Sequence, residues 1–295
     1  MRLVWLAVIC AGCFAPSAAT GVPCEAACPG EQLCVNHVCR EPGDLPPGDS
    51  DGDGRGDLDD NCPMLANEDQ HDEDGDALGD SCDPCPHLPG DAGDADSDGV
   101  GDACDPEPEN PRQHLRYFDP FTSLDDTWSG WSDDVLEDDR LHVKRDVFAD
   151  LAVRSGSLRV ETGGMLFAPN VDAPHKLSIE FGHTNNGANF HFVELYDEGD
   201  GDGGIQITEA DGDLFTSHAR TPYGTLRPGR WSIRLDESVA DQRIELAAMM
   251  GDEVYPTIEA RTDGDPPLGV GNNVFVGVRN IDITFDYFVV IETLR

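Results

Sequence analysis

Oxygen-donating side chains recur at a fixed spacing in one stretch of this 295-residue chain, between Asp49 and Asp105. Three times an aspartate is followed by further aspartates at positions 3, 5, 9 and 12 counted from it. Short carboxylates at alternate positions can turn inward together, and Ca²⁺ takes roughly 6–8 oxygen ligands. The spacing therefore predicts three calcium-binding loops, with these ligands: Asp49, Asp51, Asp53, Asp57 and Asp60; Asp72, Asp74, Asp76, Asp80 and Asp83; Asp94, Asp96, Asp98, Asp102 and Asp105.

Position 6 of each loop is where the chain must bend sharply. Gly54 and Gly99 occupy it in the first and third loops, and Ala77 in the second. A Cβ makes the left-handed backbone less accessible, so we expect strain at Ala77. The loop spacing is that of an EF-hand, but prolines and acids stand where an EF-hand has amphipathic helices. Aspartate also replaces the usual glutamate at position 12, so the helix-loop-helix interpretation fails.

The remaining motifs are Asp60-Asn61-Cys62-Pro63, Asn67-Glu-Asp69-Gln70 and Gly101-Asp-Ala-Cys104-Asp105. With them, residues 49–105 resemble the thrombospondin type 3 repeat. The resemblance implies that calcium and disulfides, in place of a hydrophobic core, hold the segment together, with bridges Cys62–Cys82 and Cys85–Cys104. A disordered acidic tail is the alternative interpretation. A disordered tail would not explain why the aspartate spacing is kept in all three loops, each with a single cysteine near its end.

The charge of the chain also indicates that calcium is its partner. The formal net charge is −40, and residues 41–110 contain 24 acids against a single base, Arg55. This balance argues against nucleic acid or an anionic membrane surface as a partner. Without a bound cation the segment would repel itself, so calcium is the expected counterpart.

The chain opens with a basic residue followed by a short apolar run, Leu3–Ile9. This run is far below the roughly 20 residues of a membrane span and is typical of a signal peptide. Cys10-Ala-Gly-Cys13 resembles a bacterial lipobox, which implies an outer-membrane or cell-surface lipoprotein held by lipid on Cys13 alone. Ser17-Ala-Ala19 offers an ordinary cleavage site instead, which predicts a secreted chain that begins at Thr20.

Cysteine parity fits an exported protein. Of the ten cysteines, Cys10 would leave with the leader and Cys13 would take lipid, so eight remain for disulfides. Four of these lie in a stretch too short to bury a core, where we predict a small disulfide knot of open pairing: Cys24, Cys28, Cys34 and Cys39. The alternatives are a zinc site on these four cysteines and a redox role for Cys82-x-x-Cys85. Both are disfavoured in an exported protein, where cysteines form disulfides.

Proline-rich linkers and a change of composition divide the chain. We predict a leader at 1–20, the knot with its linker at 21–43, calcium repeats at 44–111 and a β-domain at 112–295. In the last part apolar residues alternate with polar ones, as in half-buried antiparallel strands. The alternating sets are Leu177, Ile179 and Phe181; Trp231, Ile233 and Leu235; Val274, Val276 and Val278; Ile281, Ile283 and Phe285. They favour a two-sheet sandwich or jelly roll.

Three stretches, Phe118–Trp128, Gly229–Leu235 and Thr284–Val290, resemble the opening, middle and closing strands of concanavalin A-like, laminin-G-like jelly rolls. The expected fold class is mainly β: a C-terminal antiparallel sandwich of this type, preceded by an irregular segment stabilised by calcium and disulfides. Members of that fold include glycan binders, adhesion modules and family 16 glycoside hydrolases. The fold therefore leaves the ligand open.

A hydrolase of that family carries its two carboxylates on a Glu-x-Asp-x-Glu strand, which this chain lacks. The nearest set is Glu194, Asp197 and Glu198, and its first spacing of three directs two carboxyls to opposite faces. We therefore expect no catalytic residue. A sugar platform could come from Trp128, Trp131 or Tyr223, although core packing is the alternative for each.

The predicted function is that of an exported protein in which a calcium-stiffened stalk presents a β-sandwich for carbohydrate binding or adhesion. Its expected partners are calcium and a glycan or cell-surface ligand. A polysaccharide hydrolase and a purely structural spacer are the rival functions.

Overall fold

The computed structural model describes residues 33–35, 38–40, 48–90, 93–123, 135–136, 139–143, 147–152, 157–169, 174–184, 189–199, 202–222, 224, 226–262 and 273–294. The chain divides into two compact units, Met1–His71 and Asp72–Arg295. The described residues contain strands, turns and bends but no helix, so none of them offers a helical membrane span. The predicted mainly-β class is confirmed.

The first unit contains a short hairpin and the first acidic loop. Strand β1 (Leu33–Val35) pairs antiparallel with β2 (Val38–Arg40), and Cys34 and Cys39 are register partners in it. Residues 48–71 form turns and bends around the first set of aspartates. Cys13, Cys24 and Cys28 lie outside the described residues, so the lipid anchor and the pairing in the knot stay predictions.

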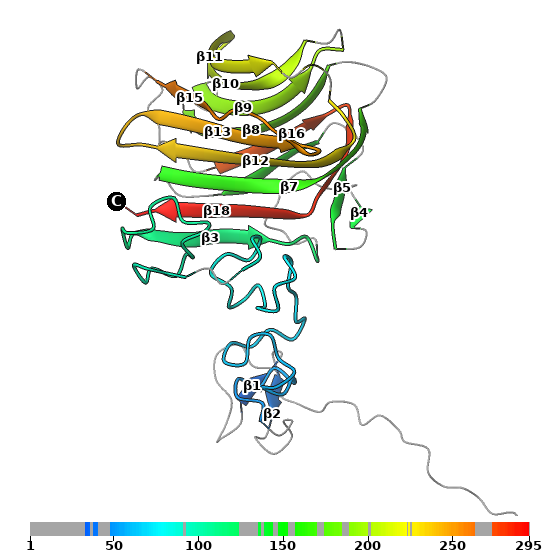
Figure 1. The fold of residues 1–295 in the computed structure, drawn as a ribbon, viewed down its shortest axis with the longest axis vertical. Helices are drawn as coiled ribbons and strands as arrows, with labels where there is room; N and C mark the ends of the chain where they lie inside the picture. The colour runs from blue at the N-terminus through cyan, green and yellow to red at the C-terminus, as the bar shows by residue number, and fades with distance from the viewer. Residues whose placement is uncertain are drawn as a thin grey trace, which may run out of the picture. The chain divides into compact units, whose positions relative to one another are not determined.

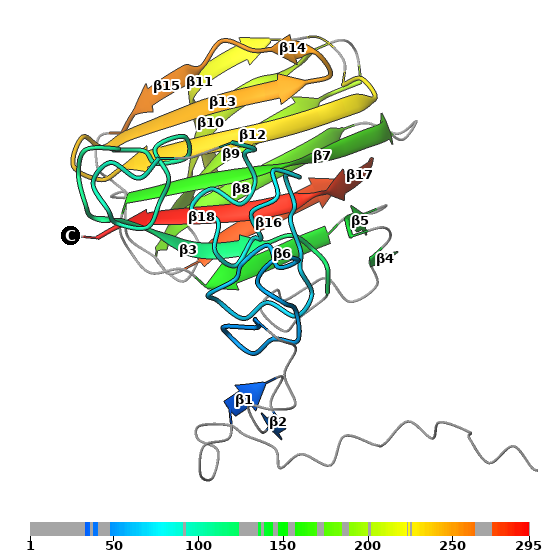
Figure 2. The same cartoon turned by 60° about the horizontal axis from the view of Figure 1, so that its bottom comes forward.

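The second unit is built on two antiparallel sheets packed face to face (Figures 1 and 2). The first has six strands in the order β11-β10-β9-β8-β16-β6. Their bounds are Leu214–Pro222 for β11, Gly203–Asp211 for β10, Asn189–Asp197 for β9, His175–Thr184 for β8, Asn273–Arg279 for β16 and Val147–Ala152 for β6.

The second sheet has ten strands, and its main path is β14-β13-β12-β7-β17-β5-β4. Strand β15 also pairs with β13, and β18 pairs with β7 on one side and β3 on the other, so the first and last strands of the sandwich are neighbours. The bounds are β3 Gln113–Asp119, β4 Val135–Leu136, β5 Leu141–Val143, β7 Ser157–Pro169, β12 Gly229–Ser238, β13 Arg243–Met250, β14 Glu253–Val254, β15 Ile258–Arg261, β17 Ile281–Phe285 and β18 Tyr287–Thr293.

The core lies between the sheets and is filled by alternate residues of each strand, because successive side chains of a strand point to opposite faces. Every member of the four alternating sets named above is buried in this one cluster. Trp231 is among its largest fully buried side chains, and its ring packs edge-on against Phe285 with centroids 5.3 Å apart. The predicted antiparallel sandwich is therefore confirmed.

Strand β7 is the longest and holds the second sheet together, since it pairs with β12 along one edge and with both β17 and β18 along the other. Gly164 lies where β17 gives way to β18. A Cβ at this position would lie 2.0 Å from the carbonyl oxygen of Thr284, so only glycine fits the close approach of the two strands.

Candidate functional site

The three acidic loops repeat one hydrogen-bond pattern. In each, the carboxylate at position 1 accepts bonds from the backbone N–H groups of positions 4 and 6; in the third loop Ser97 and Gly99 donate to Asp94 over 2.7 and 3.0 Å. The same bonds are made by Gly52 and Gly54 to Asp49, and by Gly75 and Ala77 to Asp72. An aspartate that captures nearby N–H groups is a turn former, which explains why the loops form without a core.

The carboxylate at position 9 closes each loop, because it accepts a bond from the N–H of position 2 across seven residues. The donors and acceptors are Ser50 and Asp57 at 2.7 Å, Glu73 and Asp80 at 2.9 Å, and Ala95 and Asp102 at 2.9 Å. The sequence placed Asp57, Asp80 and Asp102 among the ligands. In the structure each binds the backbone at the loop closure, outside the central cluster.

That central cluster consists of positions 1, 3 and 5. In each loop one carboxylate oxygen from each of these three residues lies within 4.8 Å of the other two, in the groups Asp49, Asp51 and Asp53; Asp72, Asp74 and Asp76; Asp94, Asp96 and Asp98. At position 3 the Oδ2 atoms of Asp51, Asp74 and Asp96 are buried and have no hydrogen-bond partner among the described residues. A buried carboxylate oxygen without a partner is costly, and a cation would satisfy it.

Electrostatics supports the same interpretation. Burial raises the pKa of Asp74 to about 6, and the charges of Asp76, Asp83 and Asp72 add to the rise. Burial and neighbouring aspartates also raise the pKa values of Asp51 and Asp96. Like charges this close disfavour ionisation unless a cation lies between them. The loop carboxylates thus fit Ca²⁺, a hard ion that takes oxygen ligands.

Position 5 links each loop to the chain that follows it. Its second oxygen accepts a bond from a backbone N–H 14 or 15 residues later, in the pairs Asn67 to Asp53 at 3.0 Å, Gly90 to Asp76 at 2.9 Å and Gln113 to Asp98 at 2.7 Å. Gln113 is the first residue of β3. In the third loop, therefore, a predicted calcium ligand also holds the start of the sandwich.

Position 12 has a capping role as well. Asp60, Asp83 and Asp105 each accept a bond from the N–H two residues later, at 2.7 or 2.8 Å. The other oxygen of Asp105 is buried without a partner in the described part of the chain.

At position 6 the backbone is left-handed in all three loops, with φ of 98° at Gly54, 80° at Ala77 and 93° at Gly99. The strain expected at Ala77 follows from that conformation.

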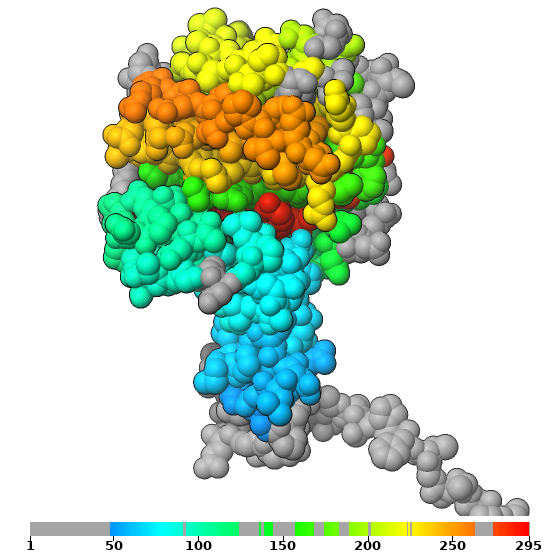
Figure 3. All heavy atoms as spheres, viewed as in Figure 1, coloured from blue at the N-terminus to red at the C-terminus, as the bar shows by residue number. Residues whose placement is uncertain are grey.

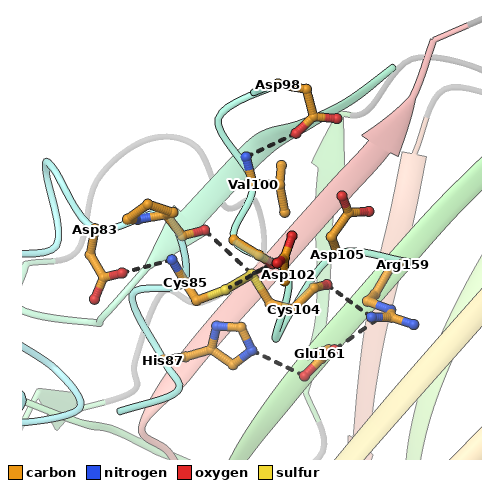
Figure 4. Close-up of a disulfide and its surroundings, with 12 residues drawn as sticks. Asp83, Cys85, His87, Asp98, Val100, Asp102, Cys104, Asp105, Arg159 and Glu161 are labelled. Atoms are coloured by element: carbon orange, nitrogen blue, oxygen red, sulfur yellow. Dashed lines mark hydrogen bonds and ion pairs between the residues drawn. A yellow bond between two sulfur atoms is a disulfide. The ribbon is translucent and has the colours of Figure 1, made fainter. Parts of the chain in front are cut away.

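The third loop is packed on the outer face of the second sheet (Figures 3 and 4). The predicted disulfide Cys85–Cys104 is present, and both cysteines are buried with Val100 against Val289 and Ile291 of β18. Cys62 and Cys82 are each disulfide-bonded as well. The repeat therefore covers apolar side chains that the sheet alone would expose.

Charged groups of β7 complete this contact (Figure 4). Nε2 of His87 lies 3.0 Å from Oε2 of Glu161, and the guanidinium of Arg159 donates to the carbonyl of Cys104 over 2.8 Å. Burial alone would raise the pKa of Glu161, but the bond with His87 and the charges of His87 and Arg159 outweigh it and lower that pKa. The contact is thus both apolar and ionic.

A second candidate site lies on the outer face of the six-stranded sheet. It is a cavity of about 300 Å³ over β8 to β11, which we call the β8–β11 groove, lined by Lys176, Phe192, Glu194, Gln206, Thr208 and Phe215, with Ser217. Burial raises the pKa of Glu194, against the charge of Lys176, whose Nζ is 3.5 Å from Oε1 of Glu194. Glu194 also accepts a hydrogen bond from Gln206.

Alternation along β9 separates Glu194 from Asp197, although the two residues are only three positions apart. Glu194 lines the groove, whereas the carboxylate of Asp197 accepts bonds from the N–H groups of Gly199 and Leu226 at 2.8 and 3.0 Å. Glu198 is exposed and lies 3.7 Å from Lys176. The expected separation of Glu194 from Asp197 matches this arrangement.

Sequence reasoning missed the aromatic residues of the groove. Three aromatic residues that the sequence offered for a sugar platform lie outside the described residues: Trp128, Trp131 and Tyr223. The aromatic side chains that do line the groove are Phe192 and Phe215, whose rings meet edge-on with centroids 6.1 Å apart. Alternation of Phe190 and Phe192 along one strand was the available signal.

Residues 41–70 and 93–108 match the family described as the thrombospondin type 3 repeat, which confirms the resemblance of the acidic segment. No curated protein matches the chain. Among solved structures, the CBM2 module of the evolved Dit of Lactobacillus casei BL23 phage J-1 is similar at 8% identity and a TM-score of 0.48, over 62% of this chain and 96% of that one.

Two further solved structures are similar to this chain. Lectin II from Ulex europaeus has 10% identity and a TM-score of 0.47, over 61% of this chain and 100% of that one. The carbohydrate binding module CBM66 from Bacillus subtilis has 10% identity and a TM-score of 0.39, over 57% of this chain and 96% of that one.

Proposed function

We propose that this is an exported calcium-binding protein in which calcium orders an acidic repeat segment and the repeat presents a β-sandwich that binds carbohydrate. The observation that carries the calcium part is the repeated cluster at positions 1, 3 and 5. At position 3 of every loop one oxygen is buried and has no hydrogen-bond partner among the residues that the structure describes. The family match over residues 41–70 and 93–108 supports it, because repeats of that family bind calcium.

Export is supported by the disulfides at Cys62, Cys82, Cys85 and Cys104, because such bonds persist in oxidising compartments. The proposal also includes the lipid on Cys13, the attachment to an outer membrane and the disulfide knot of four cysteines. It further includes the division of the chain into segments that end at residues 20, 43 and 111. Mass spectrometry of the mature N-terminus tests the anchor, and a chain that begins at Thr20 would replace it by secretion.

Binding is favoured over hydrolysis by the surroundings of Glu194. Its carboxylate is held by Lys176 and Gln206, and Asp197 is engaged by backbone N–H groups elsewhere. A retaining glycosidase needs two carboxyl groups roughly 5–5.5 Å apart that are free to act on one bond. The sandwich therefore acts as a binding domain without turnover.

The calcium part is tested by calorimetry and small-angle scattering on the full chain during calcium titration. We expect affinities of about 10⁻⁴–10⁻³ M per site, as in other extracellular modules, with ordering of the segment as calcium binds. The variant Asp96→Ala should lose one site. The control Asp59→Ala removes the same charge at a non-ligand position and should lose none. A chain whose heat signal and dimensions ignore calcium up to about 10 mM would contradict the proposal.

The carbohydrate part is tested on a glycan array with the calcium-loaded full chain. Retention of one or more glycans supports binding. Release of shorter sugars from a retained polysaccharide would show a hydrolase instead. An array without any retained glycan, together with calcium-dependent ordering, would leave the structural spacer as the function.

A further inference from the structure

The outer face of the six-stranded sheet is unusual in what it buries. Side chains that point away from the sandwich core are normally solvated, yet Glu194 is 3% and Thr208 is 3% exposed. Both line the β8–β11 groove, with Phe192 and Gln206 beside them. The face is therefore hollowed enough to remove polar side chains from water, which a flat solvated sheet does not do.

Thr208 brings a buried hydroxyl to the groove. Its Oγ1 is buried and makes no hydrogen bond to any of the residues that the structure describes. Leaving a buried hydroxyl unsatisfied costs about 1–3 kcal/mol, so such a group indicates a partner that arrives from outside. A hydroxyl can donate to and accept from a ligand hydroxyl equally well.

Aromatic rings lie next to this hydroxyl. Phe192 is the register partner of Thr208 on the neighbouring strand, and its ring meets that of Phe215 edge-on with centroids 6.1 Å apart. Phe215 is 61% exposed although it lies in a strand. Apolar ring surface beside a few fixed polar groups is the composition of a small-ligand site.

The charges of the groove decide which ligand fits. Lys176 is shared between Glu194 and Glu198, at 3.5 and 3.7 Å, so its charge is already matched. Glu180 is the register partner of Phe192 and lies close enough to Glu194 for their charges to interact. An anionic ligand would meet this acidic surface with no unmatched cation lining the cavity, and like charges in a half-buried site repel strongly.

We propose that the β8–β11 groove is the carbohydrate site of the protein, and that its ligand is a glycan segment whose sugars are uncharged or carry amino groups. This assignment rests on the proposed function. The apolar faces of the sugars lie on Phe192 and Phe215, and their hydroxyls bond with Thr208 and Gln206. An amino group is attracted by the negative charge that remains because Glu194 and Glu198 share the single cation Lys176. Sugars with carboxylate or sulfate groups are excluded by the same glutamates.

The test uses the calcium-loaded full chain and soluble oligosaccharides of three kinds: neutral xylo- and cello-oligosaccharides, glucosamine oligomers, and acidic oligogalacturonates. We expect calorimetry to detect binding of the neutral or amino-bearing kind only. Thr208→Val keeps the shape of the side chain and removes a hydroxyl that has no hydrogen-bond partner in the described part of the chain. It should leave the melting temperature unchanged or raise it, and weaken binding at least about 10-fold, which corresponds to 1.4 kcal/mol.

A second pair of variants distinguishes a loss of binding from a loss of folding. Phe215→Ala should weaken binding by a similar factor, whereas its exposed neighbour Leu214→Ala should not, since Leu214 does not line the groove. Thr216→Val is the matched control for Thr208→Val: it makes the same change at an exposed threonine of β11 outside the groove. Both controls should bind as the unaltered chain does.

Three results would overturn the assignment in distinguishable ways. Glycan binding that survives both Thr208→Val and Phe215→Ala would place the site elsewhere and leave the proposed function intact. If the unaltered chain binds oligogalacturonates and both variants weaken that binding, the groove is the site but the proposed class of ligand is wrong. An unaltered chain that binds no oligosaccharide of any kind would refute both the assignment and the proposed function.

Discussion

At the scale of single residues, the acidic loops work because the aspartate at position 3 uses its two oxygens for different tasks. One oxygen caps nearby N–H groups and shapes the turn, while at position 3 the other is left buried without a partner in the described chain. Local capping of this kind needs no tertiary contact. Capping thus shapes the turns locally, whereas the unneutralised charges of the loops oppose folding until an ion binds.

Ala77 offers a test of the loop geometry at position 6. It holds φ at 80°, a conformation that costs a non-glycine residue roughly 1–2 kcal/mol. Ala77→Gly removes the strain but adds freedom to the unfolded chain, so we expect calcium affinity of the second loop to rise by about 2- to 5-fold. Calorimetric titration of the full chain measures it.

The reciprocal change is the control for that measurement. Gly54→Ala introduces a Cβ at the same loop position of the first loop, where φ is 98°, and should weaken its site by a comparable factor. Equal affinities before and after both substitutions would mean that position 6 does not limit the loops.

Glu180 gives a pH-dependent prediction. Burial raises its pKa from 4.5 to about 7 in the folded protein, and the charge of Glu194 adds to the rise. The folded state then binds more protons than the unfolded state between these two values, so stability falls as pH rises through this window. Glu180→Gln removes this penalty, and we expect roughly 2–3 kcal/mol of stabilisation above pH 8.

The gain should vanish below pH 4, where the carboxyl is protonated in both states. Denaturant unfolding of the two proteins at pH 4 and pH 8, each at the same calcium concentration, measures the difference. A stabilisation by Glu180→Gln that is the same at both pH values would show that the effect comes from packing and not from ionisation.

At the scale of elements, the third repeat behaves as part of the second sheet. The disulfide-closed segment from Cys85 to Cys104 covers Val289 and Ile291 of β18, and Arg159 of β7 holds the carbonyl of Cys104. The position-5 carboxylate Asp98 binds the N–H of Gln113, where β3 begins. A repeat with almost no core of its own thereby gains apolar contacts, and the sheet loses an exposed apolar face.

At the scale of the whole molecule, this contact bears on where the sandwich can be cut. The predicted boundary between 111 and 112 stays a prediction, but a chain that begins at 112 would expose Val289 and Ile291, which are both fully buried in the structure. Exposing a large aliphatic side chain costs roughly 1.5–3 kcal/mol. The sandwich can fold from residue 112 only if it tolerates that loss.

Two truncated chains, 84–295 and 112–295, test this expectation. Both contain every strand from β3 to β18, but only the longer one keeps the Cys85–Cys104 segment. We expect the longer chain to melt at least about 6 °C higher, because exposing two side chains costs about 3 kcal/mol or more and each kcal/mol is worth ~2–4 °C for a domain of this size. Binding of a hydrophobic dye by the shorter chain alone would support the exposure of β18. Equal melting temperatures and no dye binding by either chain would show that the repeat contributes nothing to the stability of the sandwich.

The sequence by itself determined the features that depend on short range. The three loops and their bend at position 6 follow from residues fewer than 20 positions apart, and strand alternation sorts Leu177, Ile179 and Phe181 to one face without reference to the rest of the chain. The Cys85–Cys104 bridge was expected only from the resemblance to the thrombospondin type 3 repeat. Side-chain capping and the two-residue period of a strand are local properties.

Only the tertiary structure decided which residues meet across strands. Lys176, Phe192, Thr208 and Phe215 come from four strands, and the register that brings them to one groove depends on the pairing of β8 to β11. Likewise Glu161 and His87, 74 residues apart, pair because the third repeat packs on β7. Burial of a charged or hydroxyl group depends on what covers it, and no spacing within the sequence specifies that cover.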